Sequence, residues 1–403
     1  MLSKSTANVA VLKQSPDLLL VCMWMALLSV GLVVVASSSI AFTSANYDDS
    51  WYFVKRHLVF LLVSSVVVLV MLVIPTGYWR KFAPLLLLIA IMLLILVLVP
   101  GIGRKVNGAQ RWIDFGFFAV QISEVVKFAV IMFFSAYFSE RAAHNMRGLK
   151  EFFGLIAILA VVLALLVAEP DFGSMVVIGA TAISIMFLAG VKLRYFIPLI
   201  FLASVALALL AYVSPYRMQR LVAFIDPWAD QFNSGYQLTQ SLIAFGRGEW
   251  FGVGLGNSLQ KLFYLPEAHT DFVFSILAEE MGLVGGMIVL GIFSVLIARI
   301  WRVAKACSVR GDLFLTYAIY AIAVLFALQV FINIGMASGL LPTKGLTLPF
   351  VSYGGSSLII SCAFMAFVVR ADLEMREVPD IKTPVTNPSK TRSHLRNLSE
   401  VAA

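Results

Sequence analysis

Ten long apolar runs divide the chain, and they constrain its fold more than any other feature. A helix needs roughly 20 apolar residues to span a hydrocarbon core. Inside that core every backbone amide must be satisfied within the segment, so runs without alternating polarity predict helices and not barrel strands. The sequence therefore predicts an all-α polytopic integral membrane protein with ten transmembrane helices, near residues 18–42, 58–74, 82–100, 122–138, 152–168, 175–190, 196–213, 272–300, 313–337 and 355–370.

Composition excludes a water-soluble protein. The 403 residues are 61% hydrophobic and 13% charged, whereas soluble domains average about 45–50% and about 25%. The net charge of +8 comes from scattered Lys and Arg residues and not from a basic block, so nucleic acid is not an expected partner. The three cysteines predict no disulfide framework, and the four histidines lie too far apart in sequence for a dedicated metal site.

The basic residues indicate the orientation of the chain, because Lys and Arg are retained on the cytoplasmic side. With the N-terminus inside, the predicted inner segments hold 19 of them and the outer segments hold 10. We therefore expect both termini in the cytoplasm. The predicted parts are a cytoplasmic N-terminus at 1–17, a ten-helix membrane domain at 18–370, and a polar cytoplasmic tail at 371–403 that we expect to be disordered.

Two outer segments are longer than simple turns: residues 101–121, and residues 214–271 between the seventh and eighth predicted helices. The second is rich in aromatic residues, so we expect it to pack on the outer membrane surface. Its stretch GRGEWFGVGLG, residues 246–256, superficially resembles a phosphate-binding loop. Because it belongs to no βαβ unit, tight turns are the simpler interpretation. No internal repeat is visible, which disfavours an inverted-repeat transporter.

Ionisable residues gather at the predicted outer helix ends, where charge is costly and therefore a candidate for function. If these ends converge, they form a charged cavity near the outer leaflet. Simpler interpretations exist for each: Glu124 and Lys127 can form a local i, i+3 ion pair. Asp171 can cap a helix, and Arg111 can anchor the membrane interface. The group comprises Arg111, Asp114, Glu124, Lys127, Glu169, Asp171, Glu267 and Asp271.

Asp271 is the sharpest candidate for chemistry. Pro266 suits the first position of a helix, which would place Glu267 and Asp271 on one face of the first two turns. The helix dipole would favour the carboxylate and desolvation would raise its pKa, and the sequence does not decide between them. His269 is either a second proton-transfer group or a hydrogen-bonded structural residue. Of the adjacent acids at 279–280, which cannot share one helix face, we expect one to be a structural partner within the bundle.

Several blocks of the sequence together resemble the SEDS family of bacterial shape, elongation, division and sporulation proteins, from the third predicted helix to the tenth. The resemblance is closer to the division branch than to the elongation branch. One departure is Ile122, where the family's QPSE motif has proline; Ser123 and Glu124 remain. The blocks are VNGAQRWIDFG, ISEVVK, AEPDFGS, the long block from NSGYQLTQ through GRGEWFGVGLGNSLQK and LPEAHTDF to GLVGG, and LPTKGLTLPFVSYGGSS.

This resemblance implies a glycosyltransferase of the bacterial inner membrane that polymerises lipid II into glycan strands at the outer face during septal division. Its implied partners are a class B penicillin-binding transpeptidase and other division proteins of the membrane. The alternatives left open are a lipid II flippase, an elongation-type polymerase and a structural scaffold. Candidate sites outside the cytoplasm favour an enzyme over a transporter, because a transporter must expose its site to both faces.

The resemblance also implies roles for individual residues. The family's essential carboxylate corresponds to Asp271, which would be the base. A leaving diphosphate requires positive charge, and Lys127 and Arg111 are the expected partners. A divalent cation, Mg²⁺ or Mn²⁺, can share that role, although no ligand cluster in the sequence establishes one. The substrate-binding candidates are Arg111, Glu124, Lys127, Asp171 and His269.

Overall fold

The computed structural model describes residues 15–377 except 107, 115, 117, 142–148 and 214. Each of the ten apolar runs forms a helix, so the prediction of a mostly helical polytopic membrane protein is confirmed. By length and composition, seven of these helices can cross a membrane, while α6, α7 and α8 carry shorter apolar stretches. The helices are α2 (Leu18–Asn46), α3 (Tyr52–Val73), α4 (Thr76–Leu98), α5 (Ile122–Arg141), α6 (Leu149–Ala168), α7 (Phe172–Leu188), α8 (Phe196–Val213), α11 (Val273–Val309), α12 (Leu313–Ala337) and α13 (Gly355–Glu377).

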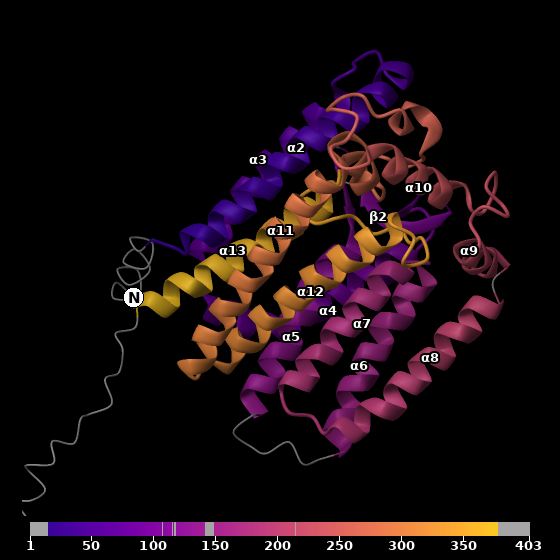
Figure 1. Ribbon diagram of the computed structural model, residues 1–403. Helices are drawn as coiled ribbons and strands as arrows, with labels where there is room; N and C mark the ends of the chain where they lie inside the picture. Colours follow the sequence, from indigo (N-terminus) through magenta and orange to yellow (C-terminus); the bar gives the residue numbers. More distant parts are fainter. Residues whose placement is uncertain are drawn as a thin grey trace, which may run out of the picture.

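The helices form one bundle, with the pair α2 and α3 along one edge and α8 along the other (Figure 1). Of the seven long helices, α5, α12 and α13 are the most enclosed, whereas α3 and α4 turn large apolar side chains outward, such as Leu62 and Leu88. Lipid tails are as apolar as leucine, so an apolar exterior costs nothing in a bilayer. Polar and charged groups within this apolar bundle therefore mark the candidate site.

A small antiparallel sheet lies in the outer segment before α5. Its strands are β1 (Gly103–Val106), β2 (Ala109–Asp114) and β3 (Ala119–Gln121), in that order. In the register, Trp112 pairs with Arg104 on one side and with Gln121 on the other. The expectation of a purely helical protein missed this sheet. Gly108, with a φ of 78°, allows the tight turn between the first two strands.

The second outer segment, between α8 and α11, is also ordered. It contains α9 (Pro215–Ile225), α10 (Tyr236–Gly248) and a short π-helical turn, η3 (Gln260–Tyr264). Figure 1 shows α9, α10 and β2 at the same end of the bundle. The hydroxyl of Ser241 on α10 lies 2.6 Å from that of Ser275 and donates to the Ala337 carbonyl at 2.6 Å. This segment therefore joins α10 to α11 and α12.

The opposite end of the bundle is held by charged residues. Arg299 of α11 donates to Asp17 at 2.8 Å, and the Asp17 amide donates to Asp372 of α13 at 2.9 Å. Helix α13 continues to Glu377, beyond residue 371 where we expected the tail to begin. The rest of that tail, most of the expected N-terminal segment and the link at 142–148 lie outside the described residues.

Candidate active site

Asp271 lies in a tight turn immediately before α11. The prediction that a helix begins at Pro266 is wrong: Glu267 has a φ of 56°, and the helix begins at Val273 after the N-cap residue Phe272. The amides of Thr270 and Phe272 both donate to the Glu267 carbonyl at 3.2 Å. A left-handed residue cannot continue a right-handed helix, so the turn replaces the expected first two helical turns.

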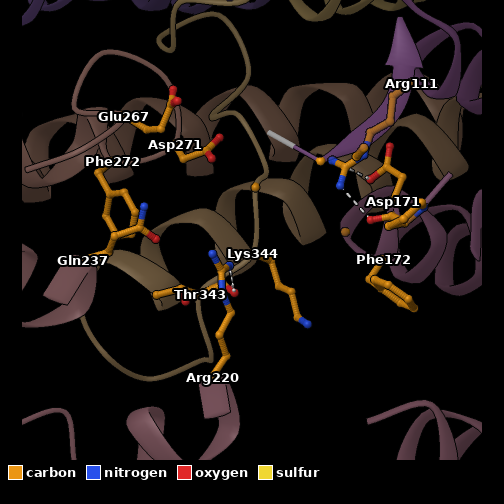
Figure 2. A pocket seen from close by; sticks show the side chains of 15 residues that line it. Arg111, Asp171, Phe172, Arg220, Gln237, Glu267, Asp271, Phe272, Thr343 and Lys344 are labelled. Atoms are coloured by element: carbon orange, nitrogen blue, oxygen red, sulfur yellow. Dashed lines mark hydrogen bonds and ion pairs between the residues drawn. The ribbon is translucent and has the colours of Figure 1, made fainter. Parts of the chain in front are cut away.

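A cavity of about 500 Å³ opens beside this turn and collects charged residues from five separate segments. Figure 2 shows Glu267 and Asp271 on one side of it and Arg111 with Asp171 on the other, with Arg220 and Lys344 between them. The expected convergence of outer charges is therefore realised for these residues. The charged residues that line this cavity are Arg111, Asp171, Arg220, Glu267, Asp271 and Lys344.

Arg111 is fixed by the turn between α6 and α7. Its Nε donates to the Glu169 carbonyl at 3.2 Å and its Nη2 to the Pro170 carbonyl at 2.7 Å, while Nη1 lies 3.9 Å from the Asp171 carboxylate. Asp171 also accepts from the Ser174 amide at 3.2 Å, so the capping interpretation is confirmed. A guanidinium held by two carbonyls keeps a fixed direction, which suits it to bind an anion entering the cavity.

A second cavity of about 370 Å³ adjoins the first. Arg111, Glu267, Asp271 and Gly345 line both cavities, so the Asp271 carboxylate stands where they meet. A Cβ placed on Gly345 would lie 3.2 Å from Asp271 Oδ2, which means that the backbone approaches the carboxylate closely. Two reactants can therefore reach Asp271 from different sides. The other polar residues around the second cavity include Arg56, Gln121, Glu124, Thr347 and Ser357.

Glu124 and Lys127 form the i, i+3 ion pair that their spacing allowed. Lys127 Nζ donates to Glu124 Oε1 at 2.7 Å, and both side chains are buried. Glu124 lines the second cavity, but Lys127 lines neither of the two. A buried ion pair loses hydration, and each charge is compensated by its partner. Lys127 therefore neutralises Glu124 from behind the cavity wall.

His269 packs among aromatic rings and lines neither of these cavities. Its ring centroid lies 4.8 Å from Phe53, 5.7 Å from Phe42 and 5.8 Å from Tyr353. Its carbonyl accepts from the Tyr353 amide at 2.9 Å. Burial lowers the pKa of His269, and the negative charge of Glu267 opposes that effect only in part. The geometry favours a structural role for this residue within the Asp271 turn.

Sequence reasoning did not single out Arg220 and Lys344 as site residues. Arg220 extends from α9 and donates to the Thr343 carbonyl at 3.3 Å, and Lys344 Nζ lies 5.6 Å from the centre of the Phe172 ring. The feature that could have pointed to them is their positive charge in predicted outer segments, because Lys and Arg are usually retained on the cytoplasmic side. Because each lies in a different segment from Asp271, no spacing pattern could have joined them to it.

The pKa of the Asp271 carboxyl is raised from its ordinary value to about 7. Desolvation is the largest cause and the charge of Glu267 adds to it, while Arg111 and Arg220 oppose the shift. Desolvation is therefore the dominant influence on the pKa of Asp271, which lies two residues before the start of the helix. A general base works best when its pKa lies near the working pH. This position gives Asp271 that property near neutrality.

A dedicated metal site is not evident in the part of the chain that the structure describes, because no three His, Cys, Asp or Glu residues are grouped to hold an ion. Asp171, Glu267 and Asp271 line one cavity, but Asp171 already accepts from Ser174 and Glu267 from the Thr270 hydroxyl at 2.6 Å. These donors do not fit a dedicated divalent-cation site. The cation expected from the resemblance therefore stays a prediction.

Known proteins resemble this chain over most of its length. The sequence matches the FTSW_RODA_SPOVE family of cell cycle proteins over residues 17–377. It is 52% identical over 349 residues to the probable peptidoglycan glycosyltransferase FtsW of Saccharophagus degradans, covering 87% of this chain and 90% of that protein. It is 47% identical over 360 residues to the protein of the same name from Coxiella burnetii, covering 89% of this chain and 97% of that protein.

Solved structures share the fold. One is a chain from a peptidoglycan synthase complex, described as coordinating polymerization and crosslinking, with a TM-score of 0.74 and 26% identity. The similarity covers 90% of this chain and 99% of that one. The rod shape determining protein RodA of Thermus thermophilus has a TM-score of 0.67 and 26% identity, covering 91% of this chain and 99% of the other.

Proposed function

This chain belongs to the FtsW, RodA and SpoVE family of cell cycle proteins, and from that membership we propose that it is a peptidoglycan glycosyltransferase of the FtsW type that polymerises lipid II. Relatives of about half identity are named FtsW, whereas the similar RodA structure is only 26% identical, which favours the division branch over the elongation branch. The structural observation that supports this proposal best is Asp271, a carboxyl with a pKa of about 7 at the meeting point of two cavities.

Each cavity suits one reactant. The cavity with Arg111, Arg220 and Lys344 offers three cations to the diphosphate of the glycan donor. The other cavity would hold the acceptor sugar, with its hydroxyl directed at Asp271. The acceptor oxygen forms the new glycosidic bond as the bond from the sugar to the diphosphate breaks. Asp271 takes the hydroxyl proton, and the cations stabilise the charge that develops on the departing lipid diphosphate.

The remaining candidates support this reaction indirectly. Asp171 holds Arg111 and the start of α7 in one arrangement. Glu124 faces the acceptor cavity, where it can accept hydrogen bonds from sugar hydroxyls, and Lys127 holds its carboxylate by a hydrogen bond. The geometry favours Arg220 and Lys344 over Lys127 as direct diphosphate partners. His269 supports the turn that carries Asp271.

The test of this function is formation of glycan strands from lipid II by the purified protein in a membrane, with and without its transpeptidase. An enzyme produces polymer of increasing length. A flippase would move labelled lipid II across vesicles without lengthening it, and a scaffold would do neither. Movement of lipid II with no polymer under any partner condition would reject the proposal.

The partner prediction concerns the exposed apolar side chains of the outer segment, which include Trp250, Phe251 and Phe263. Such patches mark interaction sites, and we expect a single-span transpeptidase to dock there and raise polymerase activity. Phe251→Glu should weaken the complex by about 2 kcal/mol, roughly 30-fold in Kd, as loss of an aromatic anchor does. Phe232→Glu is the control, because Phe232 is equally exposed at 81% on another part of the segment.

Binding and polymerisation are measured for both variants against partner concentration. Full activity of the isolated chain, unchanged when the transpeptidase is added, would contradict dependence on the partner. Equal effects of Phe251→Glu and Phe232→Glu would instead contradict the assigned patch.

The topology prediction places the chain in the inner membrane at the division septum, with both termini and the loop around Arg141 to Lys150 in the cytoplasm. Cysteine labelling tests it in a background where the exposed Cys22 is serine; Cys307 and Cys362 are buried. Asn233→Cys should react with an impermeant maleimide from outside. Val309→Cys, 81% exposed in the native residue, should react only after permeabilisation. Labelling of residue 233 only from the cytoplasmic side would overturn this orientation.

A further inference from the structure

Helix α11 is broken close to the site. Gly282 has φ 68° and ψ −169°, far from helical values. The break separates an outer segment, residues 273–281, which follows Asp271 directly, from the long inner segment at 283–309. A broken helix leaves N–H and C=O groups without helical partners, and a membrane bundle must satisfy them within the protein.

The glycine-rich stretch supplies those partners. We name residues 248–254 the junction loop; its backbone pairs with both sides of the break. Two loop amides donate to carbonyls that precede the break, and two loop carbonyls accept from amides that follow it. The four bonds are Val253 to Glu279 at 3.0 Å, Gly254 to Glu280 at 3.0 Å, Leu283 to Glu249 at 2.9 Å and Val284 to Trp250 at 3.1 Å.

Glycines allow this backbone contact. A Cβ on Gly248 would overlap the Ala278 carbonyl, and one on Gly252 would overlap the Glu280 carbonyl. A Cβ on Gly282 would overlap the Gly252 amide, and its φ is also unfavourable for any L side chain. The stretch that superficially resembled a phosphate-binding loop therefore serves close packing of two backbones.

Two buried acids reinforce the same contact. Glu279, fully inaccessible, accepts from Arg247 and Ser258 and from the Leu259 amide at 3.1 Å. Glu280, 2% exposed, accepts from Lys261 at 2.7 Å. We expected only one of these acids to be a structural partner; both are, and their partners lie in the chain on either side of the junction loop, at Arg247 and at residues 258–261. The position of the junction loop is therefore fixed by both backbone and side chains.

The outer segment carries the Asp271 turn with it. Leu265, Ala268, Phe272 and Ile276 form a small hydrophobic cluster of their own, which fastens the turn to the first residues of the helix. From α12, Asn333 donates to the Asp271 carbonyl at 3.0 Å. The direction of the carboxylate therefore depends on where the outer segment lies.

We propose that Gly282 and the junction loop are positioning elements for catalysis: by fixing the outer segment of α11, they set the direction in which the Asp271 carboxylate faces the two cavities. This inference rests on the proposed function, in which Asp271 is the base. It predicts that a disturbed junction lowers kcat while substrate binding persists, because the cations of the diphosphate cavity lie on other segments. Misplacement by about 1 Å can cost about 10²-fold in rate.

The experiment compares Gly282→Ala with Gly291→Ala in the full-length protein with its partner. Gly291 lies on the same helix, with nothing within 4 Å of an added Cβ, so its variant should keep the parent kcat. Gly282→Ala should lower kcat at least tenfold, with KM for lipid II changed less than threefold. Parent kcat in a folded Gly282→Ala variant would overturn the proposal.

A second pair keeps the test decisive if Gly282→Ala does not fold. Arg247→Met deprives Glu279 of its cation but should leave a folded protein, because Glu279 keeps its hydrogen bonds from the Ser258 hydroxyl and the Leu259 amide; Arg247→Lys should restore activity. The further readout is the acid limb of the pH profile. Asp271 is surrounded by Glu267, Asp171, Arg111 and Arg220, and a displaced carboxylate should titrate closer to an ordinary aspartate, shifting the limb to lower pH.

A loss of activity that merely follows the folded fraction, with KM, kcat per folded molecule and the acid limb unmoved, would overturn the positioning role. Failure of the proposed function gives a different pattern, because the parent protein itself would then make no polymer, whereas an Asp271→Asn variant that polymerises normally would reject only the role of Asp271 as the base. An inactive Asp271→Asn variant beside a normal Gly282→Ala variant would remove the positioning role alone.

Discussion

Replacing Asp271 with asparagine is expected to lower lipid II polymerisation by about 10²- to 10⁴-fold, the usual contribution of a positioned general base. Asparagine keeps the size of the side chain but cannot take the proton of the acceptor hydroxyl. Lipid II binding should remain near normal, because Arg111, Arg220 and Lys344 are unchanged. The measurement is the length and amount of glycan strands made by the variant together with its transpeptidase.

The pH profile gives the same prediction a second readout. With a pKa of about 7, Asp271 loses its carboxylate form as the pH falls through 7, so parent activity should decline on the acid side. A carboxyl whose pKa is raised by folding disfavours the folded state above its ordinary pKa. Asparagine removes that cost, so the variant should be at least as thermally stable as the parent at pH 8.

The matched control is Asp114→Asn. Asp114 lies on the outer side, at the end of β2, and its exposed carboxylate pairs with Arg104 at 2.9 Å. This variant should polymerise at the parent rate, since exposed ion pairs contribute little. If Asp271→Asn also polymerises at the parent rate, Asp271 is not the base and the mechanism proposed here is wrong.

The helices were predictable because hydrocarbon imposes one simple demand on the backbone. Their ends were less so: the run at 272–300 predicted a helix that in fact continues to Val309, through Arg302 and Lys305. Hydropathy reports which residues contact lipid and not how long a helix is. The part of a helix that extends beyond the lipid therefore has no hydropathy signal. The β1 to β3 sheet had no signal, since its strands have three to six residues within one outer segment.

The kinds of residue that form the site could be predicted from the sequence, but the contacts among them could not. Charge at outer helix ends identified Arg111, Asp171 and Asp271, because isolated charge is costly there. The distance of 109 residues between Arg111 and Arg220 hides their shared cavity. Local strain was also hidden: a positive φ at a non-glycine residue such as Glu267 follows from its surroundings and not from its own preference.

Burial of the Glu124–Lys127 ion pair changes the expected effect of replacing Lys127. The resemblance made Lys127 a candidate for direct diphosphate contact, and Lys127→Met would then weaken both lipid II binding and stabilisation of the leaving diphosphate. In the structure Lys127 is 2% exposed and its ammonium group contacts Glu124. Removing one partner of a buried ion pair leaves the other charge uncompensated, at a cost of about 3–5 kcal/mol.

Lys127→Met is therefore expected to lower thermal stability strongly and to lose activity through Glu124, whose buried carboxylate no longer has its cationic partner. The double variant Glu124→Gln/Lys127→Met should recover most of the stability, because it buries no lone charge, but not the activity if Glu124 binds the acceptor sugar.

Lys344→Met, in the diphosphate cavity, is the contrasting variant: it should weaken lipid II binding with a smaller loss of stability. Unfolding temperature and lipid II binding are measured for all three. A Lys127→Met protein as stable as the parent, with weakened lipid II binding, would contradict the supporting role and restore Lys127 as a direct ligand of the diphosphate.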